Sequence, residues 1–321
     1  MPDYSSYRRA FAEALVYLGE RNPNLIVLDA DTARSTGTIL FAEKYPRRFI
    51  NIGISEQDLI ATAAGLAIAG KIPVAVAFAM FLLRGWEQIR NIIARDRLNV
   101  KLVGTHAGLS AHFDGSSHQC LEDIAVMRVL PNVTVVVPAD AIATRHLIFD
   151  AIEKHKGPLY MRLGRDNSPK IYSEHDTLSI GKANILEDGE DLSIFVCGSL
   201  TELALDVSKN LKSMGISAEV VDVYTIKPLD TTTILKSVRR TGHAVTIEEH
   251  NIIGGLGSAI TEFLSETYPV RIIRIGIRDT FGASAKSYPE LLSFFGLTVH
   301  HVLKYIKKII TGEVYAPQIS K

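Results

Sequence analysis

The chain has 321 residues, 47% of them hydrophobic and 22% charged, which is typical of a soluble globular protein long enough for two domains. Its 35 Lys and Arg residues are balanced by 35 Asp and Glu residues, so no basic excess favours nucleic acid as a partner. The two cysteines, Cys120 and Cys197, are too few for a disulfide scaffold.

Helix and strand patterns alternate along the first half of the chain. Apolar residues at helical spacing predict helices, and short continuous apolar runs predict buried strands. In chain order we predict a helix at Tyr7–Leu18, a strand at Leu25–Leu28, a helix at Glu56–Ala69, a strand at Pro73–Phe78, a helix at Gly85–Arg95, strands at Val100–Val103 and Val133–Val137, a helix at Ile142–Lys154 and a strand at Leu159–Arg162.

After an irregular segment at Gly164–Ile180, the alternation resumes. The second half predicts strands at Leu192–Val196, Ala218–Val223, Ala244–Ile247 and Val270–Ile275, and helices at Thr201–Met214, Thr231–Arg239, Leu256–Glu266 and Thr298–Thr311. Buried strands that alternate with helices indicate parallel sheets covered on both faces. The predicted fold class is therefore α/β, with two consecutive doubly wound domains on mainly parallel sheets. We place the first domain at residues 1–166, a linker at 167–185 and the second domain at 186–321.

Neither a leader nor a membrane span is predicted. The N-terminal sequence MPDYSSYRRAF lacks the apolar run of a signal peptide. The most apolar stretch, Thr62 to Leu83, contains Lys71 and Pro73 and fits a buried helix followed by a buried strand. We expect a cytoplasmic protein with no membrane partner.

Ligand sites in open α/β sheets form outside the carboxyl ends of the strands, so the turns there are candidates. The first candidate turn, Asn51 to Gln57, opens a helix, and helix capping by Ser55 and Glu56 is a sufficient explanation for it. The second turn places Phe78, Phe81 and Arg84 three residues apart, which by itself is more typical of core aromatic residues.

The third candidate turn, Gly104 to Gln119, favours function over packing. It contains three histidines and an aspartate within 13 residues, a composition too polar for a core segment. Metal-site spacing is absent, so no metal ligand is assigned in this chain.

Five motifs occur in the order seen in transketolases. They are GISEQ at the start of a helix, the F-x-x-F turn, the H…DG-x-x-HQ loop, LPN-x-x-V-x-x-PAD from Leu130 to Asp140, and L-x-R from Leu163 to Arg165. Each motif is weak alone, but five in order form a strong signal. The sequence resembles the C-terminal half of a thiamine-diphosphate-dependent transketolase, the pyrimidine-binding domain followed by the transketolase C-terminal domain.

The diphosphate end of that family's cofactor site has no match. A full-length transketolase begins with a domain whose Gly-Asp-Gly motif and downstream Asn hold magnesium and the cofactor diphosphate. The nearest strings, Phe113-Asp114-Gly115 and Glu187-Asp188-Gly189, lack the first glycine, and no P-loop occurs. The resemblance implies a split enzyme in which an N-terminal subunit holds the diphosphate and Mg²⁺ or another divalent ion. It also implies self-association into a two-plus-two heterotetramer.

The resemblance assigns cofactor-binding roles to residues in the first two turns. Glu56 is the catalytic carboxyl that contacts N1′ of the aminopyrimidine, and Phe78 and Phe81 form the aromatic wall against that ring. The other implied cofactor-binding positions are Asp31, Ile54 and Arg84. Arg84 departs from transketolases, which often have Tyr there, and matches the related deoxyxylulose-phosphate synthases.

The resemblance also assigns substrate-binding roles. Arg8, Ser35, His106 and Arg165 match positions that bind the sugar phosphate, for which the planar fork of Arg is well suited. Asp114 and His118 match residues that bind sugar hydroxyls, and His118 is also implied to be catalytic because imidazole can move protons. The family's DGPTHQ loop reads DGSSHQ here, with Ser116 and Ser117 in place of Pro and Thr.

In the second predicted domain, the run from Gly255 gives only part of a dinucleotide-binding fingerprint, because Ile260 stands where the third Gly or Ala would be. We assign no catalytic residue to this domain.

The leading functional hypothesis is the C-terminal subunit of a split transketolase, which transfers a two-carbon ketol unit between sugar phosphates. One alternative is the β subunit of a 2-oxo-acid dehydrogenase E1 component, and another is half of a deoxyxylulose-phosphate synthase. A binding module that has kept the fold and lost the cofactor is the non-enzymatic alternative.

Overall fold

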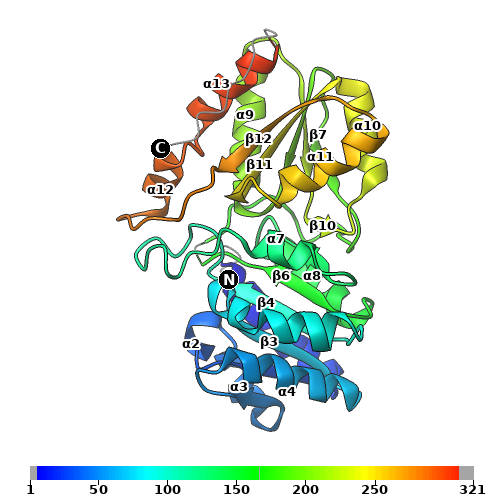
Figure 1. The fold of residues 1–321 in the computed structure, drawn as a ribbon, viewed down its shortest axis with the longest axis vertical. Helices are drawn as coiled ribbons and strands as arrows, with labels where there is room; N and C mark the ends of the chain where they lie inside the picture. Colours follow the sequence, from blue (N-terminus) through cyan, green and yellow to red (C-terminus); the bar gives the residue numbers. More distant parts are fainter. Residues whose placement is uncertain (1–5, 166, 311–321) are drawn as a thin grey trace.

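Two mainly parallel sheets organise the chain in the computed structural model, which describes residues 6–165 and 167–310. Figure 1 shows the sheet of the first half below that of the second half along the long axis of the molecule. The predicted fold class, two consecutive α/β domains, is confirmed. Within the described residues, no helix is long and apolar enough to cross a membrane.

The first sheet has seven strands in the order β10-β5-β6-β4-β3-β1-β2. Six come from the first half of the chain and pair in parallel: β1 (Leu25–Asp29), β2 (Phe49–Asn51), β3 (Ile72–Phe78), β4 (Lys101–Thr105), β5 (Thr134–Val136) and β6 (Leu159–Arg162). β1, β4, β5 and β6 are buried at every position, as their apolar runs require.

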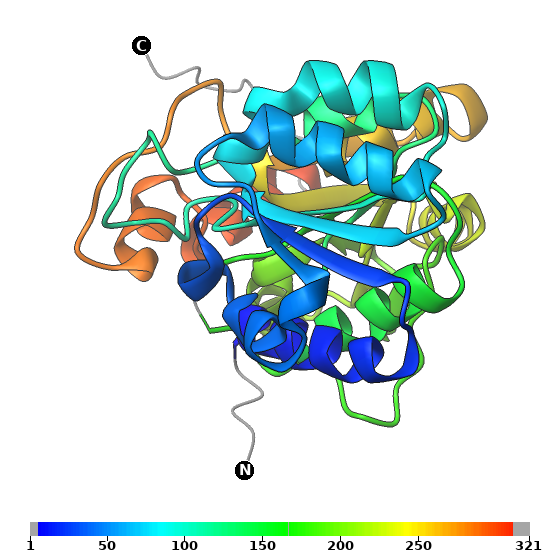
Figure 2. The same ribbon diagram turned by 90° about the horizontal axis from the view of Figure 1, so that it is seen from below.

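Alternation along the strands separates the two faces of this sheet. Ile26 and Leu28 of β1 join one apolar cluster, whereas Leu25 and Val27 join another. The first cluster lies under α4 (Glu56–Ile68), η3 (Ile89–Ala94) and α7 (Asp123–Arg128), and the second under α1 (Tyr7–Arg21), α3 (Ile39–Lys44) and α8 (Ala141–Glu153). Figure 2 shows the sheet between these two helical layers.

Several short elements of the first half differ from the prediction. The expected helix at Gly85–Arg95 is broken into η2 (Leu83–Gly85), α6 (Trp86–Gln88) and the π-helical η3, preceded by α5 (Ala79–Leu82). The periodicity was right but did not reveal the change of helical pitch. Three further elements, α2 (Ala33–Thr36), α3 and η1 (Pro46–Arg48), are too short to give a clear period.

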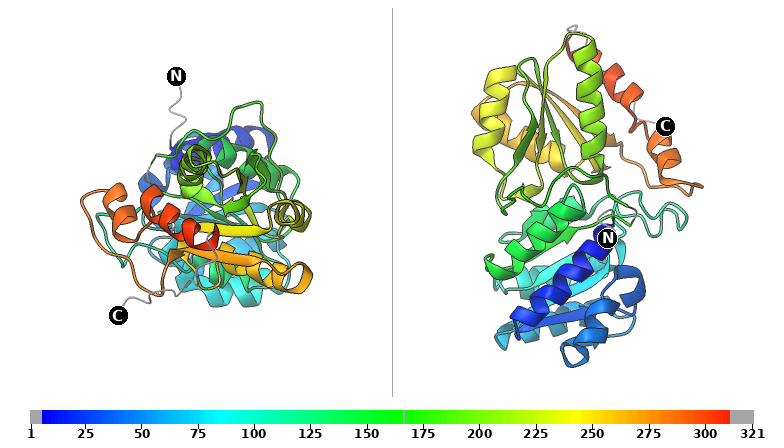
Figure 3. Two further views of the ribbon diagram at one scale, coloured as in Figure 1. Left: turned by 90° about the horizontal axis from the view of Figure 1, so that it is seen from above. Right: turned by 180° about the vertical axis from the view of Figure 1, so that it is seen from behind.

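The second sheet has five strands in the order β12-β11-β8-β9-β7. β8 (Leu192–Val196), β9 (Ala218–Asp222), β11 (His243–Asn251) and β12 (Arg271–Ile277) are parallel, and β7 (Asn184–Glu187) pairs antiparallel with β9. α9 (Thr201–Ser213) and α13 (Val299–Ile310) cover one face, and α10 (Thr231–Thr241) and α11 (Leu256–Thr267) the other. Figure 3 shows these layers from behind, and the remaining elements are η4 (Gly198–Leu200) and α12 (Tyr288–Phe294).

Segments that follow the first half in the sequence pack into its sheet and its core. β10 (Thr225–Lys227) belongs to the second half in sequence but pairs antiparallel with β5 at the edge of the first sheet. The segment at 167–180 has no helix or strand, yet its Tyr172 and Leu178 are buried in the core of the first half. The expected linker is therefore packed rather than loose, and β7 begins within it at Asn184.

Candidate active site

The candidate residues gather at one edge of the first sheet. Because its neighbouring strands are parallel, their carboxyl ends lie side by side, with Phe78 of β3 opposite Thr105 of β4 and Gly104 opposite Arg162 of β6. The turns that follow β1, β2, β3, β4 and β6 supply, in order, Asp31 and Ser35, Glu56, Phe81, the loop from His106 to Gln119, and Arg165.

Glu56 is a buried carboxylate at the start of α4. Its side chain is 6% exposed, and it forms an ion pair with Arg84, whose Nε lies 3.6 Å from Glu56 Oε2. Arg84 lies in the turn after Phe81, and its side chain is 71% exposed. Ser55 makes no side-chain capping hydrogen bond, so the capping explanation for this turn is wrong for Ser55. Helix capping by Ser55 therefore does not explain why Glu56 is buried.

Four aromatic rings form a cluster between the turns after β3 and β4. Phe78 stacks on Phe81 with centroids 5.2 Å apart and on His106 at 3.7 Å, and His118 meets the edge of Phe81 at 5.2 Å. Phe78 and Phe81 are only half-buried. The cluster therefore presents partly open aromatic surface beside the sheet edge, and its implied role as a ring-binding wall stays a prediction.

His106 is a buried, uncharged imidazole. Its backbone is left-handed, with φ of 57°, and its Nδ1 shares a 3.0 Å hydrogen bond with Thr105 Oγ1. Burial, reinforced by the positive charges of Arg8 and Arg165, lowers the pKa of His106 to about 3. At neutral pH it offers a neutral hydrogen-bonding group rather than a cation.

Two arginines form the basic part of the site. Arg8 donates from Nε to the Arg165 carbonyl at 3.1 Å and from Nη1 to the Ser35 carbonyl at 2.5 Å, so it joins the turns after β1 and β6. Arg165 Nη1 contacts Asp114 Oδ2 at 2.8 Å, and both side chains are partly exposed. The structure thus brings together Arg8, Ser35, Asp114 and Arg165, with the hydroxyl of Ser35 playing no part in these bonds.

Asp31 and Ile54 lie on exposed turns at the rim. The backbone N–H of Asp31 donates to Asn51 Oδ1 at 3.0 Å, and Asp31 Oδ1 accepts from Asn51 Nδ2 at 3.1 Å. Ile54 is 80% exposed. In the described part of the chain, the side chain of Asp31 is hydrogen-bonded to Asn51, and both Asp31 and Ile54 lie in turns at the carboxyl end of the sheet, so their implied role in cofactor binding stays a prediction.

Sequence reasoning missed Asp29, the buried acid that shapes the turn after β1. It accepts hydrogen bonds from Thr32, Thr36 and Thr38, at 2.6 to 2.9 Å, and burial raises its pKa. The sequence signal that could have revealed this residue was the group of threonines that follows Asp29, because their hydroxyls can donate hydrogen bonds to a buried carboxylate. Asp29 orders the turn that carries Asp31 and Ser35.

The loop from His106 to Gln119 also contacts the second half. Gln119 Nε2 donates to the Ala283 carbonyl at 2.8 Å, and the Ala285 N–H donates to the His112 carbonyl at 3.0 Å. Figures 1 and 2 show this loop beside the segment that leads to α12. Across residues 6–165 and 167–310, no three His, Cys, Asp or Glu side chains are grouped closely enough to hold a metal ion.

The partial fingerprint at Gly255 is explained by capping. The Glu248 carboxylate accepts from the N–H groups of Leu256 at 2.7 Å and Gly257 at 2.9 Å, and so occupies the N-terminus of α11. A Cβ on Gly255 would overlap Glu248 Oε2, so the glycine is needed for this approach. The protein's own carboxylate stands where a phosphate would bind.

Comparison with known proteins identifies the family. Residues 3–170 match the model of the transketolase pyrimidine-binding domain, and residues 181–302 match that of the transketolase C-terminal domain. The chain belongs to the transketolase family.

Two relatives and a solved structure that match nearly the whole chain support its membership of the transketolase family. A protein of Methanocaldococcus jannaschii, provisionally named a transketolase C-terminal section, is 46% identical over 97% of this chain and 98% of its own. A 6-deoxy-6-sulfo-D-fructose transketolase subunit of Clostridium sp. strain MSTE9 is 37% identical over 92% of each chain. The solved split-gene transketolase, an inactive β4 tetramer, is 44% identical with a TM-score of 0.87, covering 96% of this chain and 98% of that one.

Proposed function

We propose that the chain is the C-terminal subunit of a split transketolase. It transfers a two-carbon ketol unit from a ketose phosphate such as xylulose 5-phosphate to an aldose phosphate. The observation that carries the proposal is the convergence of a buried carboxylate, an open aromatic wall and two arginines at one sheet edge. The relatives that match this chain over nearly its full length support the split arrangement.

The residues at this edge fit the aminopyrimidine end of thiamine diphosphate. Phe78 and Phe81 offer partly open faces for a planar heteroaromatic ring, and Glu56 is a buried carboxylate beside the exposed side chain of Arg84. Once bound, the cofactor would supply the thiazolium carbanion chemistry. Glu56 would hold a proton at N1′, and its own side chain is only 6% exposed although the neighbouring Gln57 and Asp58 are exposed.

The substrate's phosphate would bind at the arginine pair. Arg165 already holds one carboxylate oxygen of Asp114 at 2.8 Å, and a phosphate oxygen can take that place because the guanidinium fork suits both anions. His106, being neutral, contributes a hydrogen bond rather than charge. His118 and Asp114 would contact sugar hydroxyls.

The two arginines could also bind a sugar that carries another anionic group in place of phosphate. The Clostridium relative is named for a sulfonated sugar, and a sulfonate presents oxygens to a guanidinium much as a phosphate does. We propose a phosphorylated donor as the first choice because two arginines join at the site.

A partner subunit would supply the diphosphate and metal end of the cofactor, in a two-plus-two assembly. The solved relative supports this, because that protein is described as inactive when its β chains form a tetramer.

Reconstitution tests the proposed function. This chain, a candidate N-terminal subunit and their mixture are each given thiamine diphosphate, Mg²⁺, xylulose 5-phosphate and ribose 5-phosphate, and glyceraldehyde 3-phosphate is followed. We expect product only in the mixture. Product from this chain alone would overturn the split arrangement. A mixture that binds but makes no product, and instead decarboxylates pyruvate, would favour the 2-oxo-acid alternative.

A further inference from the structure

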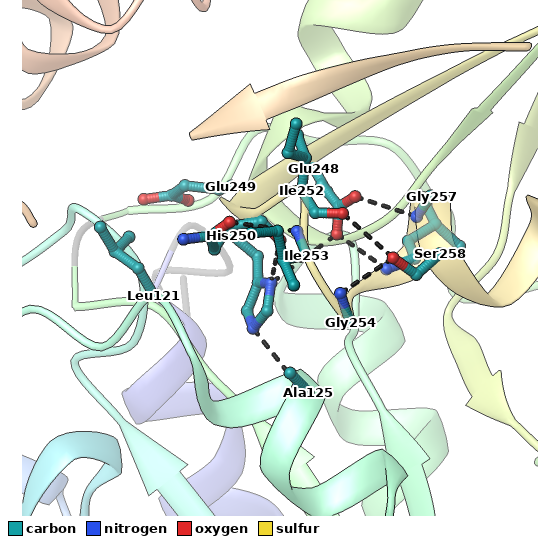
Figure 4. Close-up of polar contacts among 12 residues, drawn as sticks. Leu121, Ala125, Glu248, Glu249, His250, Ile252, Ile253, Gly254, Gly257 and Ser258 are labelled. Atoms are coloured by element: carbon teal, nitrogen blue, oxygen red, sulfur yellow. Dashed lines mark hydrogen bonds and ion pairs between the residues drawn. The ribbon is translucent and has the colours of Figure 1, made fainter. Parts of the chain in front are cut away.

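Two consecutive glutamates of β11 point in opposite directions. Glu248 and Glu249 are both buried, at 0% and 4% exposure, and the alternation of a strand sends their carboxylates to different sides. Figure 4 shows Glu248 directed at the start of α11 and Glu249 directed away from it. Glu248 is accounted for as the cap of α11, but Glu249 is not.

The carboxylate of Glu249 reaches the loop that follows β4. Its Oε1 accepts from the backbone N–H of Leu109 at 2.6 Å. Its Oε2 accepts from Tyr288 Oη at 2.8 Å and from the Ser199 hydroxyl. Two donors of the second half therefore orient a carboxylate whose third donor belongs to the first half.

The loop is shaped to receive this contact. Gly108 has a φ of +69°, and a Cβ there would lie 2.5 Å from Glu249 Oε1, so only glycine allows the approach. The Gly108 N–H donates to the Cys120 carbonyl at 2.9 Å, which closes the base of the loop. From the other side, Arg162 Nη2 donates to the backbone carbonyl of Glu249 at 2.9 Å.

Leu109 stands between the groups that face the proposed substrate. It follows His106, which stacks on Phe78, and precedes Asp114, which contacts Arg165. This contact fixes the backbone of Leu109 against the second half, in addition to the contacts that Gln119 and His112 make with Ala283 and Ala285. Without this contact, the loop backbone between His106 and Asp114 is less firmly held, and both side chains are less precisely placed.

We propose that Glu249 is a positioning residue for the active site, which holds Leu109 so that His106, Asp114 and His118 are placed for the sugar phosphate. The inference rests on the proposed function for the reaction, and extends it by giving the C-terminal domain a part in substrate binding. Glu249 acts through the loop and touches neither substrate nor cofactor.

The test compares Glu249→Gln with Glu248→Gln in the complex with the N-terminal subunit. Both substitutions remove one buried carboxylate from the same strand. Glu249→Gln is expected to speed amide hydrogen exchange in 106–119 by roughly tenfold and to raise KM for the sugar phosphate by roughly tenfold, with a smaller change in kcat. Glu248→Gln is expected to speed exchange at the start of α11 and to leave the loop and KM unchanged.

Tyr288→Phe provides a second variant should Glu249→Gln fail to fold. It removes one donor to Glu249 and keeps the carboxyl group, so the same changes are expected in smaller measure. The inference is overturned if neither variant alters loop exchange, if the loop loosens without any rise in KM, or if Glu248→Gln has the same effect on KM. If the unsubstituted complex shows no ketol transfer, the proposed function fails, and loop exchange alone decides whether Glu249 anchors the loop.

Discussion

At the scale of single residues, burial separates Glu56 from Asp31 and Asp114, two other acids of the site. Its carboxylate is buried at the first turn of α4, whereas Asp31 is exposed and Asp114 is paired with Arg165. The ion pair with Arg84 at 3.6 Å involves a side chain that is 71% exposed, and solvent screens such a pair strongly. Asp29 is also buried, but its carboxylate accepts hydrogen bonds from three threonines, so Glu56 is the buried acid best placed for the proposed chemistry.

Glu56→Gln should lower ketol transfer by at least about 100-fold in the reconstituted complex, since general acid–base groups typically contribute that much. Its stability should change little, because the pair with Arg84 is solvent-screened. The matched control is Asp58→Asn, which changes an exposed acid two residues after Glu56 on the same helix and should retain activity. Steady-state rates and thermal melting check both. Near-full activity in Glu56→Gln would remove its catalytic role.

At the scale of elements, the glycine-rich turn before α11 allows the Glu248 carboxylate to cap the N-terminus of this helix. Burial raises the pKa of the Glu248 carboxyl to about 7, and its hydrogen bonds to Leu256 and Gly257 oppose that rise. A Cβ on Gly255 would overlap Glu248 and approach His250 Nδ1 at 2.7 Å. The run resembles a phosphate-binding motif because both need close approach of backbone N–H groups to oxygen atoms.

Gly255→Ala is expected to destabilise the chain by roughly 1–3 kcal/mol, because the added methyl overlaps groups in a packed environment. Gly65→Ala is its control: Gly65 is an exposed residue of α4 with open space around it, so alanine should stabilise by about 0.5–1 kcal/mol. Urea unfolding of this chain alone measures both. Equal effects of the two substitutions would contradict the capping explanation.

At the scale of the whole molecule, buried polar contacts join the two halves. Arg162 of β6 pairs with Asp123 at 2.8 Å and also donates to the Glu249 carbonyl at 2.9 Å. Tyr172 Oη donates to Asp222 Oδ2 at 2.7 Å, and β10 completes the first sheet from the second half. These contacts make unfolding of either half without the other costly, so we expect one cooperative transition.

Asp222 should make stability fall as pH rises. Burial raises its pKa to about 8 from the ordinary 3.8, so between these values the folded chain keeps a proton that the unfolded chain releases. The free energy of unfolding should then decrease by roughly 1 kcal/mol per pH unit from this group, and Asp222→Asn should remove that slope. Urea unfolding at several pH values between 5 and 8 measures it, with the exposed Asp206→Asn as control.

Below about pH 6.5 two histidines act in the opposite sense. The pKa of His250 is lowered to about 4 and that of His106 to about 3, mainly by burial, so the unfolded chain gains protons that the folded chain does not. The contribution of these two histidines to stability should therefore fall as the pH drops from 6.5 toward 4, and this loss opposes the gain from Asp222 and Glu248 over the same range. An unchanged slope in Asp222→Asn would show that Asp222 is ionised in the folded chain.

The sequence by itself determined the fold class and the edge of the sheet on which the candidate site lies. Continuous apolar strands alternating with helices permit few arrangements, and parallel strands bring the turns after them together whatever the loops contain. This is why the turns that carry Glu56, Phe78 and Phe81 could be named in advance as strand-end candidates, whereas Arg165 was named through the resemblance to transketolases. Their roles in catalysis and binding stay predictions.

Only the tertiary structure decided which atoms meet. It showed that β10 crosses to the first sheet, that Arg165 pairs with Asp114, that His106 is neutral and stacked on Phe78, and that Glu249 holds Leu109. Each of these depends on groups far apart in the chain, and on burial that no local pattern encodes. Local periodicity reports which face of a segment is apolar, whereas a pKa or a hydrogen-bond partner is set by whatever the fold packs against that face.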